Sequence, residues 1–329
     1  MRFYDIFNGD ADGICALQQL RLAEPRDAEL VTGVKRDNRL LARVRPQAGD
    51  VLTVLDIALD ENRSDLLRVL EAGAACRYFD HHYPGAVPAH PLLEAHIDTS
   101  ASTCTSLIVD RHLGGAHRAW AVVAAFGDNL PESALSAAEG LALRGDELLR
   151  LRQLGECLNY NAYGETPEDL NFHPADLYRR LHAYGDPLDF AERAPEFPAL
   201  QRALADDLEM AHLSPAEVIG SHGAAVFLPE EKWSRRVSGM LANELARKFP
   251  SRAHAVLTKS GDGYVVSLRA PQSAAPGVDQ AGIDRVARMF AGGNGRGNAA
   301  GIPMLPRAQV EKLFDALRAT YETPSMPPR

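Results

Sequence analysis

The residues best suited to chemistry are acids and histidines that each follow an apolar stretch of the chain. They are Asp10, Asp12, Asp56, Asp80, His81, His82 and Asp128. Carboxylate oxygens together with an imidazole suit Mn²⁺ or Mg²⁺, and two such ions about 3.5–4 Å apart need a carboxylate that bridges them. Asp56 is the natural bridging residue. The pattern therefore predicts a centre that holds two divalent cations.

The run Asp80-His81-His82 is the most specific part of this pattern. Three adjacent titratable groups at the end of an apolar stretch are costly to remove from water unless they bind an ion. For a single residue, an ordinary cap or turn is an equally good interpretation, since Asp12 would cap a helix that starts at Gly13 and Asp56 would begin a loop. The set as a whole favours a metal site.

The elements that must position these residues alternate in type along residues 1–130. We expect strands at residues 3–7, 29–34, 51–55 and 76–79, helices at 13–23, 63–72 and 104–113, and a long apolar run at 120–126. Strands that alternate with helices form a mostly parallel sheet with helices on both faces. Ligands bind beyond the carboxyl ends of such strands. The acids at the ends of the four apolar runs would then lie together.

The rest of the chain predicts a helical connector and a smaller α/β domain. Mostly helical sequence is expected over residues 132–218, chiefly at 133–154, 174–183 and 197–211. Strands are expected again at 224–228, 253–259 and 264–268, with helices at 239–248, 283–290 and 307–321. The turn Gly261-Asp262-Gly263 indicates a hairpin. Residues 323–329, which include three prolines, are expected to be disordered.

A Gly-rich segment at residues 292–301 is the second candidate site. Successive glycines let backbone N–H groups turn toward an anion, so this segment would hold a phosphate. The candidate substrate-binding residues are Arg296, Gly293, Gly295, Asn298 and Arg269. A flexible turn between a helix and a strand is the alternative interpretation.

Two further features receive an ordinary structural interpretation. Lys35 and Arg36 follow the second expected strand and could reach the cleft, with an ordinary solvated pair as the default interpretation. The segment at residues 159–164 contains two tyrosines and could line the cleft, but a turn in the connector with packed aromatic rings is the preferred interpretation.

Composition and charge narrow the class of protein. Of the 329 residues, 46% are hydrophobic, which excludes a disordered or collagen-like chain. The net charge of −9 argues against a globally basic protein that coats nucleic acid. Four cysteines without CxxC spacing are expected to be buried free thiols. Because neither a signal peptide nor a membrane span is apparent, we expect a soluble, cytoplasmic protein.

These motifs resemble those of the DHH phosphoesterase superfamily. The matching segments are Gly-Asp-Ala-Asp-Gly at 9–13, Asp56, Asp80-His81-His82 and Gly127-Asp128. The segment GGNGRGNAAG at 292–301 resembles the Gly-rich signature of the DHHA1 domain. The resemblance covers nearly the whole chain. Within the superfamily, the chain is similar to nanoRNase/pAp-phosphatase-like and RecJ-like members.

The resemblance implies an α/β architecture with two domains across a cleft. A mainly parallel DHH catalytic domain with helices on both faces would span residues 1–135. A helical connector would follow at 136–218, a DHHA1 substrate-binding domain at 219–322 and the disordered tail at 323–329.

The resemblance also implies a cofactor and roles for the site residues. One Mn²⁺ would bind Asp10 and Asp56, and a second would bind Asp12, Asp56, His81 and Asp128, with Mg²⁺ or Co²⁺ as alternatives. His82 would face the scissile phosphate, and Asp80 would support the metal centre. Water activated by the two cations would attack phosphorus in line.

Two positions depart from the resemblance. Several relatives have a His where this chain has Asn8, whose neutral oxygen is a weaker candidate ligand for the first metal. Arg296 stands in the Gly-rich segment where the family usually has a His. The guanidinium of Arg can still bind a phosphate, but replacing His by Arg removes a titratable imidazole from this position. Substrate choice is therefore expected to differ from that of typical nanoRNA-degrading relatives.

The expected function is a Mn²⁺-dependent phosphoesterase that hydrolyses small nucleotides or short single-stranded oligonucleotides. The acidic chain argues against long duplex DNA as a partner, and no membrane partner is expected. An exopolyphosphatase or pyrophosphatase is the alternative within the enzyme class. A catalytically degenerate nucleotide-binding protein is the alternative outside it. The oligomeric state is left open, with a homodimer as one alternative.

Overall fold

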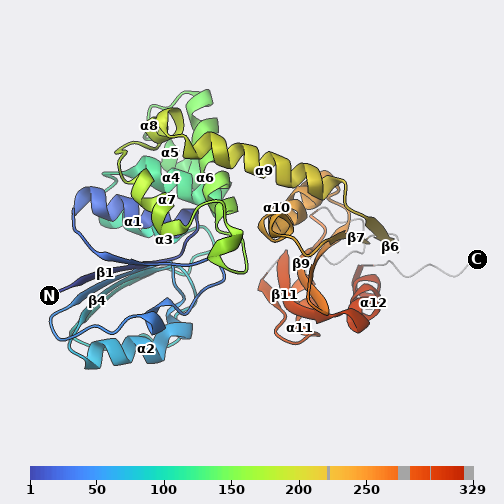
Figure 1. The fold of residues 1–329 in the computed structure, drawn as a ribbon, viewed down its shortest axis with the longest axis horizontal. Helices are drawn as coiled ribbons and strands as arrows, with labels where there is room; N and C mark the ends of the chain where they lie inside the picture. The colour runs from blue at the N-terminus through green and yellow to red at the C-terminus, as the bar shows by residue number, and fades with distance from the viewer. Residues whose placement is uncertain (221–222, 273–281, 297, 322–329) are drawn as a thin grey trace, which may run out of the picture. The chain divides into compact units, whose positions relative to one another are not determined.

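The computed structural model describes residues 1–220, 223–272, 282–296 and 298–321 (Figure 1). Its contacts divide the chain into two compact units, Met1–Leu204 and Ala205–Arg329. The boundary falls inside one helix, α9 (Glu196–His212). The division into domains at 135 and 218 stays a prediction, and the tail at 323–329 lies outside the described residues.

A parallel sheet forms the centre of the first unit. Among the described residues its strands are β1 (Phe3–Phe7), β2 (Glu29–Val31), β3 (Val51–Leu55), β4 (Ala75–Asp80) and β5 (Leu93–Ile97). They lie in the order β2-β1-β3-β4-β5, and every neighbouring pair is parallel. All five carboxyl ends therefore lie along one edge, as expected for a parallel sheet, although β5 was not among the expected strands.

Helices cover both faces of this sheet (Figure 1). They are α1 (Ala11–Ala23), α2 (Leu59–Glu71), α3 (Thr105–His112), α4 (Arg118–Gly127), α5 (Pro131–Ala138), α6 (Gly145–Asn161), α7 (Pro174–Leu181) and α8 (Pro187–Arg193). α2 lies on one face, and α1 with α3 and α4 lies on the other. The apolar run at 120–126, which we grouped with the strands, is the buried helix α4. In a continuous apolar run, the spacing of apolar residues cannot distinguish a buried strand from a buried helix.

Alternation along the strands decides what each face of the sheet buries. Tyr4 and Ile6 of β1 join the apolar cluster under α2. Between them, Asp5 points to the opposite face, where its carboxylate accepts a hydrogen bond from Arg21 of α1 (Nε–Oδ2, 2.8 Å). Both side chains of this ion pair are 2% exposed. The pair joins α1 to the sheet and helps fix the helix whose first turn carries Asp10 and Asp12.

A mixed sheet forms the second unit. Its described strands are β6 (Ala216–Ile219), β7 (Gly223–Leu228), β8 (Ala253–Ser260), β9 (Gly263–Arg269), β10 (Asn294–Arg296) and β11 (Ala299–Pro306). The order is β10-β11-β9-β8-β7-β6, and only the β7–β8 pair is parallel. The helices are α10 (Lys232–Lys248), α11 (Ile283–Arg288) and α12 (Val310–Tyr321). This unit has its own apolar core.

The structure also bears on the cysteines and on helices that could cross a membrane. All four cysteines are buried free thiols, as expected. Across the described ranges, none of the helices combines the length and apolar character that a membrane crossing requires.

Candidate metal centre

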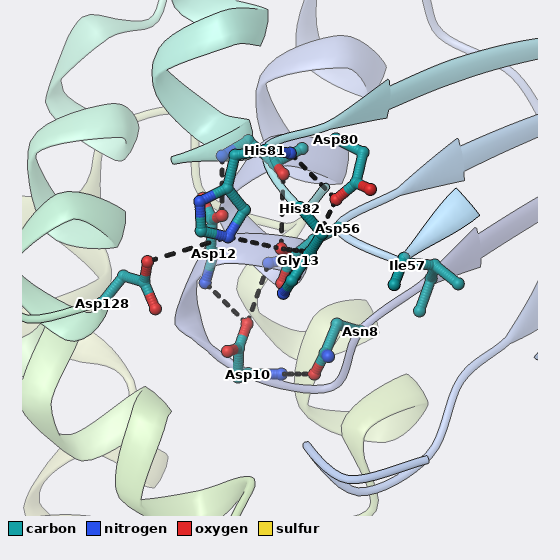
Figure 2. Close-up of polar contacts among 12 residues, drawn as sticks. Asn8, Asp10, Asp12, Gly13, Asp56, Ile57, Asp80, His81, His82 and Asp128 are labelled. Carbon is teal, nitrogen blue, oxygen red and sulfur yellow. Dashed lines mark hydrogen bonds and ion pairs between the residues drawn. The ribbon is translucent and has the colours of Figure 1, made fainter. Parts of the chain in front are cut away.

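Three strands and one helix bring the predicted residues together (Figure 2). The chain leaves β1 toward Asp10, leaves β3 at Asp56 and ends β4 at Asp80. Because these strands are parallel neighbours, their acids meet at one edge of the sheet. Asp128 arrives differently, as the residue that ends α4. Figure 2 shows its carboxylate directed at the same cluster.

Asp10 has a structural task at the start of α1. Its Oδ1 accepts hydrogen bonds from the backbone N–H groups of Asp12 (2.9 Å) and Gly13 (3.1 Å). The helix cap expected at Asp12 is thus supplied by Asp10. Gly13 is required by space, since a Cβ there would lie 2.2 Å from the backbone oxygen of Asn8. The Asp-x-Asp-Gly motif therefore packs this turn tightly and leaves the Asp12 side chain uncommitted to α1.

Asp12 instead caps a helix far away in sequence. Its two carboxylate oxygens accept hydrogen bonds from the N–H groups of Thr105 and Ser106, both at 2.7 Å. These residues begin α3, and a carboxylate is favoured at the positive end of a helix. Burial nevertheless raises the pKa of Asp12 to about 6, with the charge of Asp56 adding to the effect. A cation is the obvious means of stabilising this buried carboxylate.

Asp56 lies at the centre of the cluster. Its backbone φ of +58° is in the left-handed region, which Asp and Asn tolerate better than other non-glycine residues. Its Oδ1 lies 3.4 Å from Nε2 of His81 and accepts a hydrogen bond from Oγ1 of Thr105 (3.3 Å). Burial, and then the charge of Asp10, raise the pKa of Asp56 to about 6.

The two histidines have different surroundings. His81 is 10% exposed, and its Nδ1 donates to the backbone oxygen of Thr103 (3.1 Å). That bond directs Nε2 toward Asp56 and toward Asp128, whose Oδ2 is 3.9 Å away. A second hydrogen bond of this kind commonly orients a metal-binding imidazole. Although burial opposes the charge, the hydrogen bond to Asp56 and the nearby carboxylates raise the pKa of His81 to about 10.

His82 is 45% exposed and is held by Asp80. Nδ1 of His82 donates to Oδ1 of Asp80 at 2.7 Å, and the same oxygen accepts from the N–H of His81 (2.9 Å). The other oxygen of Asp80 is buried and has no hydrogen-bond partner among the described residues. Asp80 therefore orients the pair of histidines, while the His82 ring remains accessible.

The donor atoms fit a divalent cation. Asp12, His81 and Asp128 each offer an atom within 4.8 Å of the others, and so do Asp56, His81 and His82. Carboxylate oxygens with an imidazole nitrogen match Mn²⁺ or a similar ion. Burial is the main cause of the raised pKa values of Asp12 and Asp56, so these carboxylates are costly to keep charged without a cation. Oδ1 of Asn8 accepts the N–H of Asp10 (3.2 Å), and the role of Asn8 as a metal ligand stays a prediction.

Lys35 is a member of the site, which the sequence offered only as the alternative to a solvated pair. Its Nζ forms an ion pair with Oδ2 of Asp10, lies 3.1 Å from Oδ1 of Asn159 and 3.5 Å from Oδ1 of Asp128. The expected solvated pair of Lys35 and Arg36 is therefore wrong for Lys35. The turn expected at 159–164 also contributes, since the ring of Tyr163 lies 5.8 Å from the ammonium. A lone Lys after a short strand carries no pattern that would reveal this contact.

The Gly-rich segment of the second unit forms a hairpin, β10 and β11, beside α11. A Cβ on Gly293 would lie 1.9 Å from the oxygen of Ala287, and a Cβ on Gly295 would lie 2.4 Å from the Cβ of Ala300. The N–H of Gly293 donates to Phe290. The N–H of Gly295 donates to the side chain of Asn294. Close packing thus accounts for both glycines.

The remaining candidates lie on the same hairpin or next to it. Asn298 is exposed, and its backbone oxygen accepts the N–H of Ala270. The guanidinium of Arg269 donates to Oδ1 of Asn243 (2.6 Å) and to backbone oxygens, which ties it to α10. Arg296 ends β10, where its backbone pairs with Ala299. Their substrate-binding roles stay predictions.

Comparison with known proteins identifies the fold. A DHH-domain member of the s1p family of ribosomal proteins has 12% identity and a TM-score of 0.67, over 97% of this chain and 86% of its own. Exonuclease RecJ bound to manganese has 17% identity and a TM-score of 0.56, over 97% and 88%. The pGpG-specific phosphodiesterase PggH from Vibrio cholerae has 14% identity and a TM-score of 0.55, over 97% and 100%.

Comparison with protein-family models and with curated proteins gives no match. The likeness to solved structures is therefore one of fold, and it confirms the α/β fold expected from the sequence.

Proposed function

We propose that this chain is a metal-dependent phosphoesterase that hydrolyses small nucleotides or short single-stranded oligonucleotides. One observation carries the proposal: Asp12, His81 and Asp128 come from separate segments, yet their donor atoms lie within 4.8 Å of one another. Two proteins of the same fold support it, a RecJ exonuclease bound to manganese and a pGpG-specific phosphodiesterase.

The proposed cation is Mn²⁺, with Mg²⁺ or Co²⁺ as alternatives, and its ligands would be Asp12, Asp56, His81 and Asp128. When bound there, such a cation would polarise a phosphoryl oxygen and lower the pKa of water. The other expected ion, on Asp10 and Asp56, would have to share Asp10 with the ammonium of Lys35.

His82 is the proposed proton donor. Its Nδ1 is held by Asp80, so its Nε2 is the nitrogen left for a substrate oxygen. Although burial opposes the charge, the bond to Asp80 and the charge of Asp56 raise the pKa of His82, which favours the protonated ring. A ring in this state can hydrogen-bond the phosphoryl group and give its proton to the leaving oxygen. Asp80 acts through His82 and is a positioning residue.

Substrate phosphate is proposed to contact Arg296 and Asn298. A guanidinium pairs with a phosphate through two parallel hydrogen bonds, and an amide adds a neutral donor. Gly293 and Gly295 would let the hairpin adopt its shape, because side chains there would collide with neighbouring atoms. Arg269 would support α10 through Asn243.

A substrate panel tests the proposal. Purified protein with Mn²⁺ would be offered pApA, a short RNA oligomer, cyclic di-AMP, 3′,5′-pAp, a dinucleoside tetraphosphate and polyphosphate. We expect hydrolysis of at least one nucleotide ester and none without a divalent cation. Cleavage of polyphosphate alone would favour the phosphoanhydride alternative, and tight binding of nucleotides without turnover would favour a degenerate binding protein.

The control variant is Asp56→Asn. Asn is preferred to Ala because the backbone at this position has a positive φ, which Asn tolerates. The variant should fold normally and lose turnover by at least about a thousandfold, since removal of a central charged ligand removes transition-state stabilisation. Wild-type turnover in this variant would contradict the assignment of the metal centre.

A further inference from the structure

Lys35 is held in the cluster from several sides. Its N–H donates to the backbone oxygen of Ala162 (2.9 Å), just after α6. Its own backbone oxygen accepts a hydrogen bond from Nδ2 of Asn8 (3.3 Å). Asn159, in the last turn of α6, accepts from the ammonium (3.1 Å). The carboxyl end of a helix carries partial negative charge, which favours a cation at this position.

The ammonium reaches the residue expected to bind the first metal. Oδ2 of Asp10 forms the ion pair with Lys35, while Oδ1 accepts two hydrogen bonds from the first turn of α1. Oδ1 of Asn8, the other oxygen expected at the first metal, is uncharged and would not offset the repulsion between a dication and the ammonium. Oδ2 of Asp10 is therefore paired with a full positive charge, whereas the two oxygens of Asp12 accept hydrogen bonds from uncharged backbone N–H groups.

We propose that the ammonium of Lys35 takes the place of one of the two expected cations, so that each chain binds a single divalent cation. The inference rests on the proposed function, whose metal centre it describes more closely. A dication on Asp10 would stand beside an ammonium in a buried setting, where like charges repel strongly. Asp12, His81 and Asp128 meet no such competitor at their shared position, apart from the longer 3.5 Å contact of Lys35 with Asp128.

A difference in chemistry follows from this replacement. An ammonium neutralises charge and donates hydrogen bonds, but it does not lower the pKa of a bound water as a dication does. The role of Lys35 would be to hold Asp10 and Asp128 in place and to contribute positive charge to the site. It is a positioning residue in this scheme.

Metal stoichiometry tests the inference without reference to turnover. Full-length protein would be freed of metal with a chelator and titrated with Mn²⁺, with free ion followed by electron paramagnetic resonance. We expect one Mn²⁺ per wild-type chain. In Lys35→Met the ammonium is gone and Asp10 is released, so we expect two. Arg36→Met removes the neighbouring exposed cation and should leave one.

A second pair of variants keeps the test decisive if Lys35→Met does not fold. Asp10→Asn preserves the helix cap, because Asn caps as well as Asp, and removes only the charge. Since Asp10 pairs with Lys35 rather than with the ion, its Mn²⁺ affinity should stay within about threefold of wild type. Asp128→Asn removes a proposed ligand and should weaken Mn²⁺ binding by more than about tenfold.

The outcomes separate the two proposals. Two Mn²⁺ ions on the wild-type chain, or one ion on a folded Lys35→Met chain, would overturn the role of Lys35 and leave a metal-dependent enzyme intact. Equal losses of affinity in Asp10→Asn and Asp128→Asn would also overturn it. A wild-type chain that binds no Mn²⁺ would overturn the metal centre itself, and with it the proposed function.

Discussion

The acidic cluster of the first unit and the Gly-rich hairpin of the second both carried sequence motifs, but the structure explains them differently. In the cluster, burial, and then the charge of a neighbouring carboxylate, raises the pKa values of Asp12 and Asp56 to about 6. In the hairpin, Gly293 and Gly295 fit against neighbouring backbone and have their N–H groups bonded. Carboxylates that the fold keeps buried and close together indicate a bound ligand. Glycines in tight contact with their neighbours are explained first by packing.

The largest expected effect lies in the cluster. His82→Asn removes Nε2, the nitrogen proposed to donate a proton, while the amide can still bond Asp80. We expect kcat to fall by about 10²–10⁴-fold, the range of general acid catalysis, with Mn²⁺ binding unchanged. His90→Asn is the matched control, since the His90 ring lies away from the cluster of acids and accepts the backbone N–H of Leu92 in its own turn. Equal losses in the two variants would remove His82 from the chemistry.

A smaller effect is expected when Arg296, the charged candidate residue of the hairpin, is replaced. Arg296→Ala should raise KM by about tenfold or more for substrates with a terminal phosphate, because a charge-assisted hydrogen bond is worth about 1.5–3 kcal/mol. The KM for bis-p-nitrophenyl phosphate, which lacks a terminal phosphate, should change little. Steady-state kinetics on both substrates would check this, and a parallel rise in both would leave Arg296 without a role in recognition.

The hairpin glycines should affect stability and leave metal binding alone. Gly293→Ala places a Cβ 1.9 Å from the oxygen of Ala287 and should cost about 1–3 kcal/mol of stability. Gly145→Ala, where a Cβ meets no atom within 4 Å, is the control and should be neutral or slightly stabilising. Thermal denaturation measures both. A Gly293→Ala protein with unchanged Tm and lost Mn²⁺ binding would reverse the contrast drawn between the two regions.

The smallest expected effect is a pH dependence of the metal-free protein. The pKa values of Asp12 and Asp56 are raised to about 6 and that of His81 to about 10, so the folded state binds more protons than the unfolded state. Stability without metal should therefore fall as pH rises from about 4 to 6 through the carboxyls and from about 6.5 to 10 through the imidazole.

Added Mn²⁺ should act in the opposite direction, because its ligands must lose their protons before they bind. The increase in Tm on adding Mn²⁺ should grow from pH 5 to pH 8. Differential scanning fluorimetry with and without chelator measures it. An increase in Tm that does not depend on pH would show that the raised pKa values do not belong to the metal ligands.

Much of the first unit could be predicted because its sequence is locally consistent. Residues 3–7 and 51–55 form β1 and β3 within the expected bounds. β5 was missed, because Leu93–Ile97 is an edge strand with half-exposed residues and little alternation. β10 was also missed, because Asn294–Arg296 consists of residues that rarely favour strands. Both strands form because a neighbouring strand offers an edge.

The sequence by itself determined which residues could bind a cation, since the order of strands and acids follows from local patterns and from the geometry of parallel sheets. Only the tertiary structure decided how those residues are used. Asp12 caps α3 across 93 positions of sequence, and Lys35 meets Asp10 across 25. Such contacts depend on where a helix end or a long side chain arrives after folding. No local pattern encodes that position, because it is set by the packing of the whole unit.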